Sequence, residues 1–491
     1  MRLADKNTSA VSLVKEALEK AKKYAKYNIF TFLNEEGALR RATEIDEKIA
    51  RGEAAGRLAG VVYGLKDNFL SRDGATTASA HILEGCESPV VATAVEKLEA
   101  EGAIMLGRTN LDAFAHGSST ENSYYGPSHN SRDFDRVPGG SSGGSAVAVA
   151  LDIVEFATGT DTGGSIRQPA SFNGIYGMKP TYGTISRYGV VAMASSLDCV
   201  GFFAKSPEDM DLLMSVTAGQ DPKDMTTLPD FYDNAWGGAA DAACPSDSAP
   251  KPRRAKSSCS LEHVASTTPP TTRATKKIGI IKDFDNEVVD SEIREALAKK
   301  CELLKSKGHE IVELEMPALK YALAVYYIIQ PAEVASNLSR YDGVRYGFRS
   351  EESRGLSELY ENTRSEGFMP ENKRRIMIGN FVLSSGFYDA YFLKAAKART
   401  MIINEYAEAF SKCDYILTPV SPNPAFRLGE KVDDPVAMYL EDLMSVSLNL
   451  AGLPGLAIPA GEAKDGRALG LQLVGPRRSD KALIEFSKEL I

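Results

Sequence analysis

Helical and strand patterns alternate along most of the chain. After Ser9, apolar residues recur every three or four positions, which predicts an amphipathic helix. Short apolar runs between such segments predict buried strands, and the alternation favours an α/β sheet. The expected strands are 28–33, 58–69, 103–106, 156–160, 278–281, 311–314, 415–418, 456–459 and 469–474. The expected helices are 9–25, 39–52, 93–100, 143–150, 165–173, one ending at 304, a long helical region to about 412 and a last helix 479–491.

One stretch, 236–277, breaks this pattern. Its composition changes abruptly to Ala, Ser, Thr, Pro and Arg, so it carries too little apolar surface to offset the entropy of ordering it. We predict a disordered, low-complexity insert. A partner-binding arm and a gene-model artefact are the alternatives.

Composition and charge narrow the class of protein. The 491 residues are 43% hydrophobic and 25% charged, as in a globular chain with a large core. The net charge of −9 argues against a chain that holds nucleic acid by its own basic face, so any role with RNA requires a partner. The six cysteines include no C-x-x-C pair and no zinc-like spacing with histidine. With no apolar run of membrane-spanning length, we expect a cytoplasmic protein with reduced thiols and no membrane or metal site.

The candidate chemistry centres on two Gly/Ser loops at the ends of one helix–strand unit. The first loop, 138–145, reads P-G-G-S-S-G-G-S, and the second, 161–167, reads D-T-G-G-S-I-R. Their glycines allow positive φ and close approach of backbone N–H groups, as an oxyanion hole requires. The two loops therefore bring Ser141 and Ser165 together as candidate catalytic residues.

Three other interpretations of these loops fit less well. Residues 139–143 match the G-x-S-x-G nucleophile elbow, but a turn rather than a buried strand precedes them. The only downstream histidines, His263 and His309, lie in the low-complexity stretch and before a strand. A phosphate-binding loop lacks its Gly-Lys-Ser/Thr. Plain flexible connections do not explain twin Gly-Gly-Ser loops around one strand and helix.

Lys66 adds a third candidate. It ends the apolar run L-A-G-V-V-Y-G-L-K, where its ammonium would lose hydration. A lysine that reaches out of the strand end, or that pairs with Asp67, is the structural alternative. The functional interpretation is that burial lowers its pKa and leaves a neutral amine that accepts a proton.

With these residues the sequence resembles the amidase signature family. The matching stretches are Lys66-Asp67-Asn68 and the two Gly/Ser loops, with their serines and Lys66 spaced 75 and 24 positions apart. The resemblance implies one large α/β domain with a mixed β-sheet covered by helices on both faces. It also implies a nucleophilic Ser165, a cis peptide before Ser141, Lys66 as the base, and an oxyanion hole of backbone N–H groups from Thr162, Gly163, Gly164 and Ser165.

The resemblance divides this domain into four parts. They are an N-terminal helical segment (1–50), a catalytic core (51–205), the insert (236–277) and the remainder of the fold with the substrate pocket (278–491).

Further motifs resemble the glutaminase subunits, known as the A subunits, of heterotrimeric tRNA-dependent amidotransferases. This resemblance implies glutamine hydrolysis and delivery of ammonia to the B subunit, which amidates Glu-tRNA(Gln) with ATP and Mg²⁺, Asp-tRNA(Asn) being a second candidate. It implies a small C subunit, tRNA contacts mainly through the B subunit, and no cofactor bound by this chain. Arg375 would bind the glutamine carboxylate and Asp442 its ammonium, with Tyr326 lining the pocket. The motifs are 117–125 (G-S-S-T-E-N-S-Y-Y), 340–347 (R-Y-D-G-V-R-Y-G), 373–379 (K-R-R-I-M-I-G) and 384–391 (S-S-G-F-Y-D-A-Y).

Two alternatives stay open. One is a stand-alone amidase of the same family that acts on a small or fatty amide. The other is a catalytically silent scaffold subunit, which the presence of Lys66, Ser141 and Ser165 disfavours.

Overall fold

The computed structural model describes residues 1–5, 7–229, 232, 275–282 and 288–491. Most of the predicted insert, through residue 274, lies outside the described residues, and its disorder stays a prediction.

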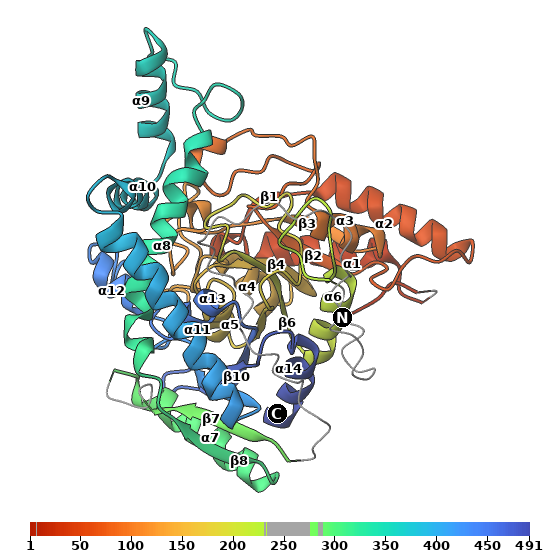
Figure 1. Ribbon diagram of the computed structural model, residues 1–491. Coiled ribbons are helices and arrows are strands. Elements are labelled where there is room, and N and C mark those ends of the chain that lie inside the picture. The colour runs from red at the N-terminus through yellow and green to blue at the C-terminus, as the bar shows by residue number, and fades with distance from the viewer. Residues whose placement is uncertain (6, 230–231, 233–274, 283–287) are drawn as a thin grey trace, which may run out of the picture.

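One mixed sheet of eleven strands organises the molecule (Figure 1). Its strand order is β1-β3-β2-β4-β6-β5-β10-β11-β9-β7-β8. Strands β3, β2 and β4 run parallel to one another, as do β9, β7 and β8, and the strands between these groups are antiparallel. The bounds are β1 Phe30–Leu33, β2 Val62–Lys66, β3 Ile104–Thr109, β4 Phe156–Asp161, β5 Tyr176–Lys179, β6 Cys199–Ala204, β7 Lys277–Ile281, β8 Glu310–Leu314, β9 Tyr415–Pro419, β10 Gly455–Glu462 and β11 Ala468–Val474.

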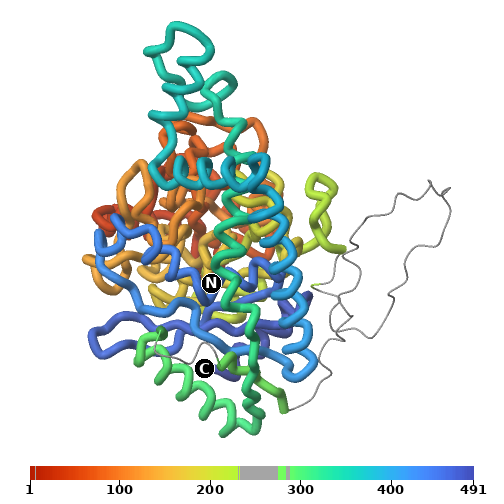
Figure 2. The backbone as a smooth tube through the Cα atoms, turned by 60° about the vertical axis from the view of Figure 1, so that its left-hand side comes forward, coloured from red at the N-terminus to blue at the C-terminus, as the bar shows by residue number. Residues whose placement is uncertain are grey.

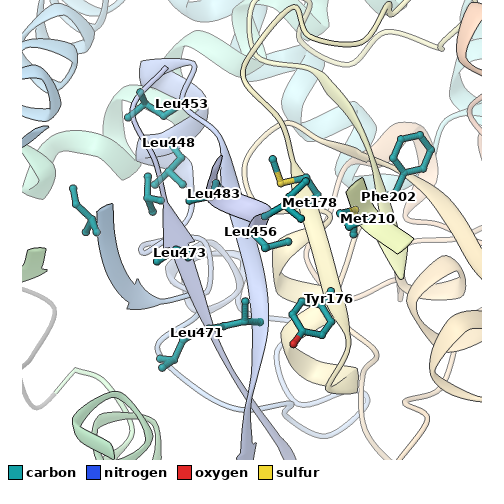
Figure 3. Close-up of a cluster of buried hydrophobic side chains, with 14 of the residues drawn as sticks. Tyr176, Met178, Phe202, Met210, Leu448, Leu453, Leu456, Leu471, Leu473 and Leu483 are labelled. Carbon is teal, nitrogen blue, oxygen red and sulfur yellow. The ribbon is translucent and has the colours of Figure 1, made fainter. Parts of the chain in front are cut away.

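Helices cover both faces of the sheet. Neighbouring residues of each strand point to opposite faces, so each strand contributes side chains to two separate cores. Val62 belongs to a core with helices α1, α2, α4 and α5, whereas the next residue, Tyr63, belongs to a core with α3, α6, α7, α8, α11, α13 and α14. Phe203 and Phe202 divide in the same way, and Figure 3 shows part of the second core around Phe202. The single α/β domain is confirmed. The helices are α1 Ala10–Lys23, α2 Glu35–Ala50, α3 Thr93–Ala100, α4 Gly143–Ala150, α5 Arg167–Asn173, α6 Pro207–Thr217, α7 Ser291–Ser306, α8 Ala322–Asn337, α9 Leu356–Gly367, α10 Pro370–Leu383, α11 Lys394–Lys412, α12 Pro435–Leu440, α13 Val446–Ala451 and α14 Asp480–Ser487.

The structure differs from the sequence expectations in several elements. Strands β5 and β6 and helix α6 were not predicted, and β2 is shorter than the expected 58–69. Strand β6 contains Gly201, which lowers strand propensity, yet glycine is needed there because a Cβ would lie 2.0 Å from the carbonyl oxygen of Met178. The long helical region before 412 is divided into α8, α9, α10 and α11. Glycine-containing turns and Pro370, at the start of α10, separate these helices.

The two ends of the molecule are formed by elements distant in sequence. Helix α9 lies at one end and the β7–β8 pair, with α7, at the other (Figures 1 and 2). Among the described helices, none combines the length and hydropathy needed to span a lipid bilayer. Cys86, Cys199, Cys301 and Cys413 are free thiols. The other two cysteines lie outside the described residues.

Helices α8 and α10 pack closely and carry two of the residues expected to bind substrate, Tyr326 on α8 and Arg375 on α10. Their contact depends on Gly379, because a Cβ at this position would lie 2.0 Å from the carbonyl oxygen of Pro331 in α8. Gly379 stands one turn after Arg375 on α10. The absence of a Cβ at Gly379 therefore sets how near this part of α10, with Arg375, lies to α8.

We predict that Gly379→Ala forces α10 away from α8 and lowers the free energy of unfolding by about 1–3 kcal/mol, as overpacking does in other cores. Denaturant unfolding of the full chain measures this. The matched control is Gly355→Ala, because Gly355 has an extended φ of −172° and no atom within 4 Å of an added Cβ. Equal stability of the two variants would contradict this account of the helix contact.

Candidate active site

Lys66 ends β2 in the interior and contacts only hydroxyl and carbonyl groups. Its Nζ lies 2.8 Å from Ser141 Oγ, 2.7 Å from Ser142 Oγ and 2.8 Å from Thr160 Oγ1. The residue is fully buried and forms no ion pair with the described residues. Neighbouring Asp67 instead accepts hydrogen bonds from Arg108 and Thr77, so neither structural alternative for Lys66 holds.

This environment favours the neutral amine. Burial lowers the pKa of Lys66 to about 7, against the opposing charges of Asp112, Asp161 and Asp198. A neutral amine has two N–H donors and one lone pair. The lone pair is then available to a hydroxyl proton at neutral pH, which a protonated lysine could not accept.

The first Gly/Ser loop holds Ser141 against Lys66. The Gly140–Ser141 peptide is cis, as the family resemblance implies. Gly140 N–H donates to Gln168 Oε1 at 3.1 Å, and the Ser141 carbonyl accepts from Asp112 N–H at 3.2 Å. A side chain at position 140 would lie 2.2 Å from an Asp112 carboxylate oxygen, so the loop tolerates only glycine there.

Ser165 lies beside this loop, between β4 and α5. Its carbonyl accepts from Ser142 N–H at 3.3 Å, which places the two loops side by side. The residue is 8% exposed, and its hydroxyl makes no hydrogen bond within the described part of the chain. A proton relay from Ser165 through Ser141 to Lys66 needs a hydrogen bond between the two serine hydroxyls; that bond is not formed, whereas the Lys66–Ser141 bond is present. Catalytic hydrogen bonds often tighten only when substrate binds.

Asp161 shapes the backbone in front of Ser165. Its carboxylate pairs with the buried Arg167 at 3.0 Å and accepts the N–H groups of Gly164 and Ile166 at 2.9 and 3.1 Å. Burial alone would raise the pKa of Asp161, but the Arg167 guanidinium, the charge of Lys179 and a hydrogen bond from Asn449 hold it well below its ordinary value. The turn is thus fixed by a permanent carboxylate.

The N–H groups of this turn are not equivalent. Those of Thr162, Gly163 and Ser165 have no partner among the described residues, whereas the Gly164 N–H donates to Asp161. Gly164 has a φ of +136°, and a Cβ there would lie 2.5 Å from Ser445 Oγ. Of the four expected oxyanion donors, Gly164 therefore supports the turn, and the other three N–H groups remain available to a ligand.

Three residues were expected to bind substrate: Tyr326, Asp442 and Arg375. Tyr326 lies over this turn, and the other two both contact the neighbouring residue, Tyr327. A Cβ on Gly163 would lie 2.7 Å from the Tyr326 hydroxyl, so Tyr326 covers the turn. Asp442 accepts hydrogen bonds from Ser118 at 2.8 Å and Tyr327 at 2.7 Å. Burial raises the pKa of Asp442 to about 6, against these hydrogen bonds.

Arg375 occupies the other side of Tyr327. Its guanidinium carbon lies 4.9 Å from the centroid of the Tyr327 ring, while Nε donates to Glu371 at 2.8 Å and Nη1 to Gln330 at 2.9 Å. The side chain is buried, unlike that of Arg374, which is exposed and pairs with Glu371 at the surface. A cationic and an anionic side chain thus flank Tyr327.

Comparison with protein families decides the relationship. The family model described as amidase matches residues 12–484. The chain belongs to the amidase family.

Individual members of the amidase family are similar over nearly their whole length. The A subunit of the glutamyl-tRNA(Gln) amidotransferase of Koribacter versatilis (strain Ellin345) is 45% identical over 462 residues, covering 94% of this chain and 90% of the relative. Its counterpart from Nostoc punctiforme is 46% identical over 475 residues, covering 96% and 92%. The crystal structure of the corresponding A subunit from Thermotoga maritima superposes with a TM-score of 0.73 at 35% identity, covering 97% of this chain and 90% of that one.

Several residues of this amidase-family site were missed in the sequence. Ser142 and Thr160 contact Lys66 directly, and Asp112 and Asp161 hold the two loops. Ser142 had a visible signal, since it stands beside Ser141 in the same Gly/Ser run. Asp112 had none, because it stands as a single acidic residue in the short segment N-L-D-A-F-A after the strand. Within the described residues no cluster of His, Cys, Asp or Glu side chains could hold a metal ion.

We predict that buried Lys66 makes stability rise with pH above neutrality. The folded chain releases this proton near pH 7 and the unfolded chain near 10.5, so the unfolded chain binds more protons between these values. The burial penalty is complete below pH 7 and disappears by pH 10.5. From pH 7 to pH 9 the free energy of unfolding should therefore rise by about 2 kcal/mol more in the native chain than in Lys66→Met.

Urea unfolding at the two pH values measures this difference. The control is Lys15→Met, at an exposed position of α1, which should keep the native pH dependence. The same slope in Lys66→Met and the native chain would contradict a lowered pKa for Lys66.

Proposed function

We propose that this chain is the glutamine-hydrolysing subunit of a tRNA-dependent amidotransferase. The observation that carries the proposal is the Lys66–Ser141 hydrogen bond beside Ser165, with Arg375 and Asp442 both in contact with Tyr327 nearby. An α-amino acid offers a carboxylate and an ammonium to such a pair of opposite charges. Glutamine carries, in addition, the side-chain amide that serine chemistry cleaves.

In the proposed reaction, Ser165 Oγ attacks the carbon of the side-chain amide. Its proton passes to Ser141 as the proton of Ser141 passes to the neutral Lys66 amine. The oxyanion that forms is met by the N–H groups of Thr162, Gly163 and Ser165, each of which stabilises such a charge by about 3 kcal/mol in comparable sites.

Collapse of this intermediate breaks the carbon–nitrogen bond. The proton held by Lys66 returns through Ser141 to the departing nitrogen, so ammonia leaves and a glutamyl ester remains on Ser165. Water, activated by the same Ser141–Lys66 pair, then hydrolyses the ester to glutamate. Each proton taken up by Lys66 is given back, and no histidine takes part.

The ammonia would pass to a partner, the B subunit, that amidates Glu-tRNA(Gln) with ATP and Mg²⁺, with Asp-tRNA(Asn) as a second candidate substrate. A small C subunit would support this pair in a heterotrimer. The similarity to proteins named as amidotransferase A subunits supports such an assembly. The net charge of −9 agrees with tRNA being held mainly by a partner. We place the reaction in the cytoplasm, with no cofactor on this chain.

We predict that Ser165→Ala, in a complex reconstituted with candidate B and C subunits, abolishes amidation of Glu-tRNA with glutamine but not with ammonium chloride. The nucleophile is lost, whereas the amidation step belongs to the partner. Product formation is followed with each nitrogen donor. Equal loss of both activities would indicate a structural role for Ser165. If the native complex hydrolyses aryl or acyl amides but not glutamine, the chain is a stand-alone amidase instead.

Lys66→Arg should be almost as inactive in glutamine hydrolysis as Lys66→Ala, with losses of at least ~100-fold in kcat, as expected when general base catalysis is removed. A guanidinium stays protonated in proteins and cannot accept the proton from Ser141. Steady-state ammonia release measures the effect, and retained ammonium-dependent amidation shows that the complex is assembled. Near-normal turnover in Lys66→Arg would exclude a neutral lysine as the base.

A further inference from the structure

Two fully buried side chains near Arg375 carry hydrogen-bond donors without a partner in the described residues. These donors are His116 Nε2 and Gln330 Nε2. Buried polar groups are nearly always paired, so each exception needs an explanation. Neither donor takes part in the reaction described above.

The hydrogen-bond network fixes the tautomer of His116. Asn372 Nδ2 donates to the Ala113 carbonyl at 2.8 Å, and Asn372 Oδ1 accepts from Met369 N–H at 3.2 Å, so the amide orientation is set. The same Nδ2 lies 2.6 Å from His116 Nδ1, which must therefore accept. Burial and the charge of Arg375 lower the pKa of His116 well below its ordinary value, so the ring is neutral. Its single proton is on Nε2, as a donor.

A hydrogen bond from Arg375 fixes the orientation of the Gln330 amide. Its Oε1 accepts from Arg375 Nη1 at 2.9 Å, because a guanidinium can only donate. The amide nitrogen therefore points away from Arg375 Nη1, with two hydrogens and no acceptor within the described residues.

Both donor residues lie close to the Arg375 guanidinium, which bonds Gln330 and whose charge acts on His116. Asn372, which holds His116, and Arg375, which holds Gln330, are three residues apart on α10 and share one face of the helix. Glu371 is the anionic partner of both Arg374 and Arg375, so one carboxylate is shared by two cations. Neutral N–H donors beside a partly compensated guanidinium match the oxygens of a carboxylate.

We propose that His116 Nε2–H and Gln330 Nε2–H bind the α-carboxylate of glutamine together with Arg375. This inference rests on the proposed function and deepens it. The two residues select amide substrates that carry a carboxylate at the distance set by the glutamine side chain. They do not act on the amide that Ser165 attacks.

The test uses the full chain with Ser165→Ala, in which glutamine binds without reacting. Calorimetry gives the Kd of L-glutamine and of 4-aminobutanamide, which keeps the amine and the amide but lacks the carboxylate. Gln330→Glu retains an acceptor for Arg375 and replaces the free donors by a carboxylate oxygen. It should raise the Kd of glutamine at least tenfold. His116→Leu should raise it about fivefold, and neither change should alter the Kd of 4-aminobutanamide more than twofold.

The matched control is Thr184→Val. The Thr184 hydroxyl is also buried without a partner in the described residues, but the residue lies elsewhere in the fold, where its carbonyl accepts from the Gly219 N–H just after α6. This variant should bind both ligands as the parent does. Unchanged glutamine binding in both test variants, or an equal loss for the two ligands, would overturn the inference and leave the proposed function intact. If the parent binds no glutamine, the proposed function fails and this inference fails with it.

Discussion

The site depends on a lysine that is buried without a carboxylate partner among the described residues. A charged ammonium in the interior is costly, and three hydroxyl groups around Lys66 replace only part of its hydration. Asp112 and Asp161 act on it from a distance, because backbone N–H groups and Arg167 occupy their oxygens. A direct ion pair would keep the amine protonated. The fold therefore engages these carboxyl groups with other partners and leaves the lysine close to its neutral form.

The close approach of three backbone segments makes this arrangement possible. Gly140 packs against Asp112 and the N–H of Ser119, at distances that no side chain would permit. The Asp161–Arg167 pair fixes the second loop, since both side chains are fully buried and bonded to the turn itself. Breaking one member of such a pair usually costs more than the pair contributes, so the loop has little freedom to rearrange. Rigid loops keep the Ser142 N–H against the Ser165 carbonyl, and with it the two serines in place.

The sequence indicated the candidate residues Lys66, Ser141 and Ser165 more clearly than the residues that surround them. Lys66 was identifiable because a charge that ends an apolar run requires an explanation, and the structure places it beside Ser141. The free N–H groups of the second turn could not be sorted from the sequence, because the capture of the Gly164 N–H by Asp161 depends on the path of the turn. His116 carried no signal at all. A lone histidine in a polar loop becomes informative only when its partner, Asn372, is known to lie on a helix far away in the chain.

Burial acts in opposite directions on the two ionisable groups that the proposed reaction needs. For Lys66 the neutral form is useful, and desolvation supplies it by lowering the pKa to about 7. For Asp442 the charged form is useful, and desolvation opposes it by raising the pKa to about 6, although Ser118, Tyr327 and Arg375 favour the carboxylate. Both groups must lose a proton, so protonation of either limits the reaction from the acid side; the shift of Lys66 relaxes this limit, whereas the shift of Asp442 tightens it. A substrate ammonium beside Asp442 would favour the charged carboxylate further, which ties ionisation of the pocket to the arrival of a zwitterionic ligand. A positively charged group on the ligand thus favours the charged form of Asp442. Lys66, in contrast, keeps its neutral form only while no carboxylate pairs with it directly.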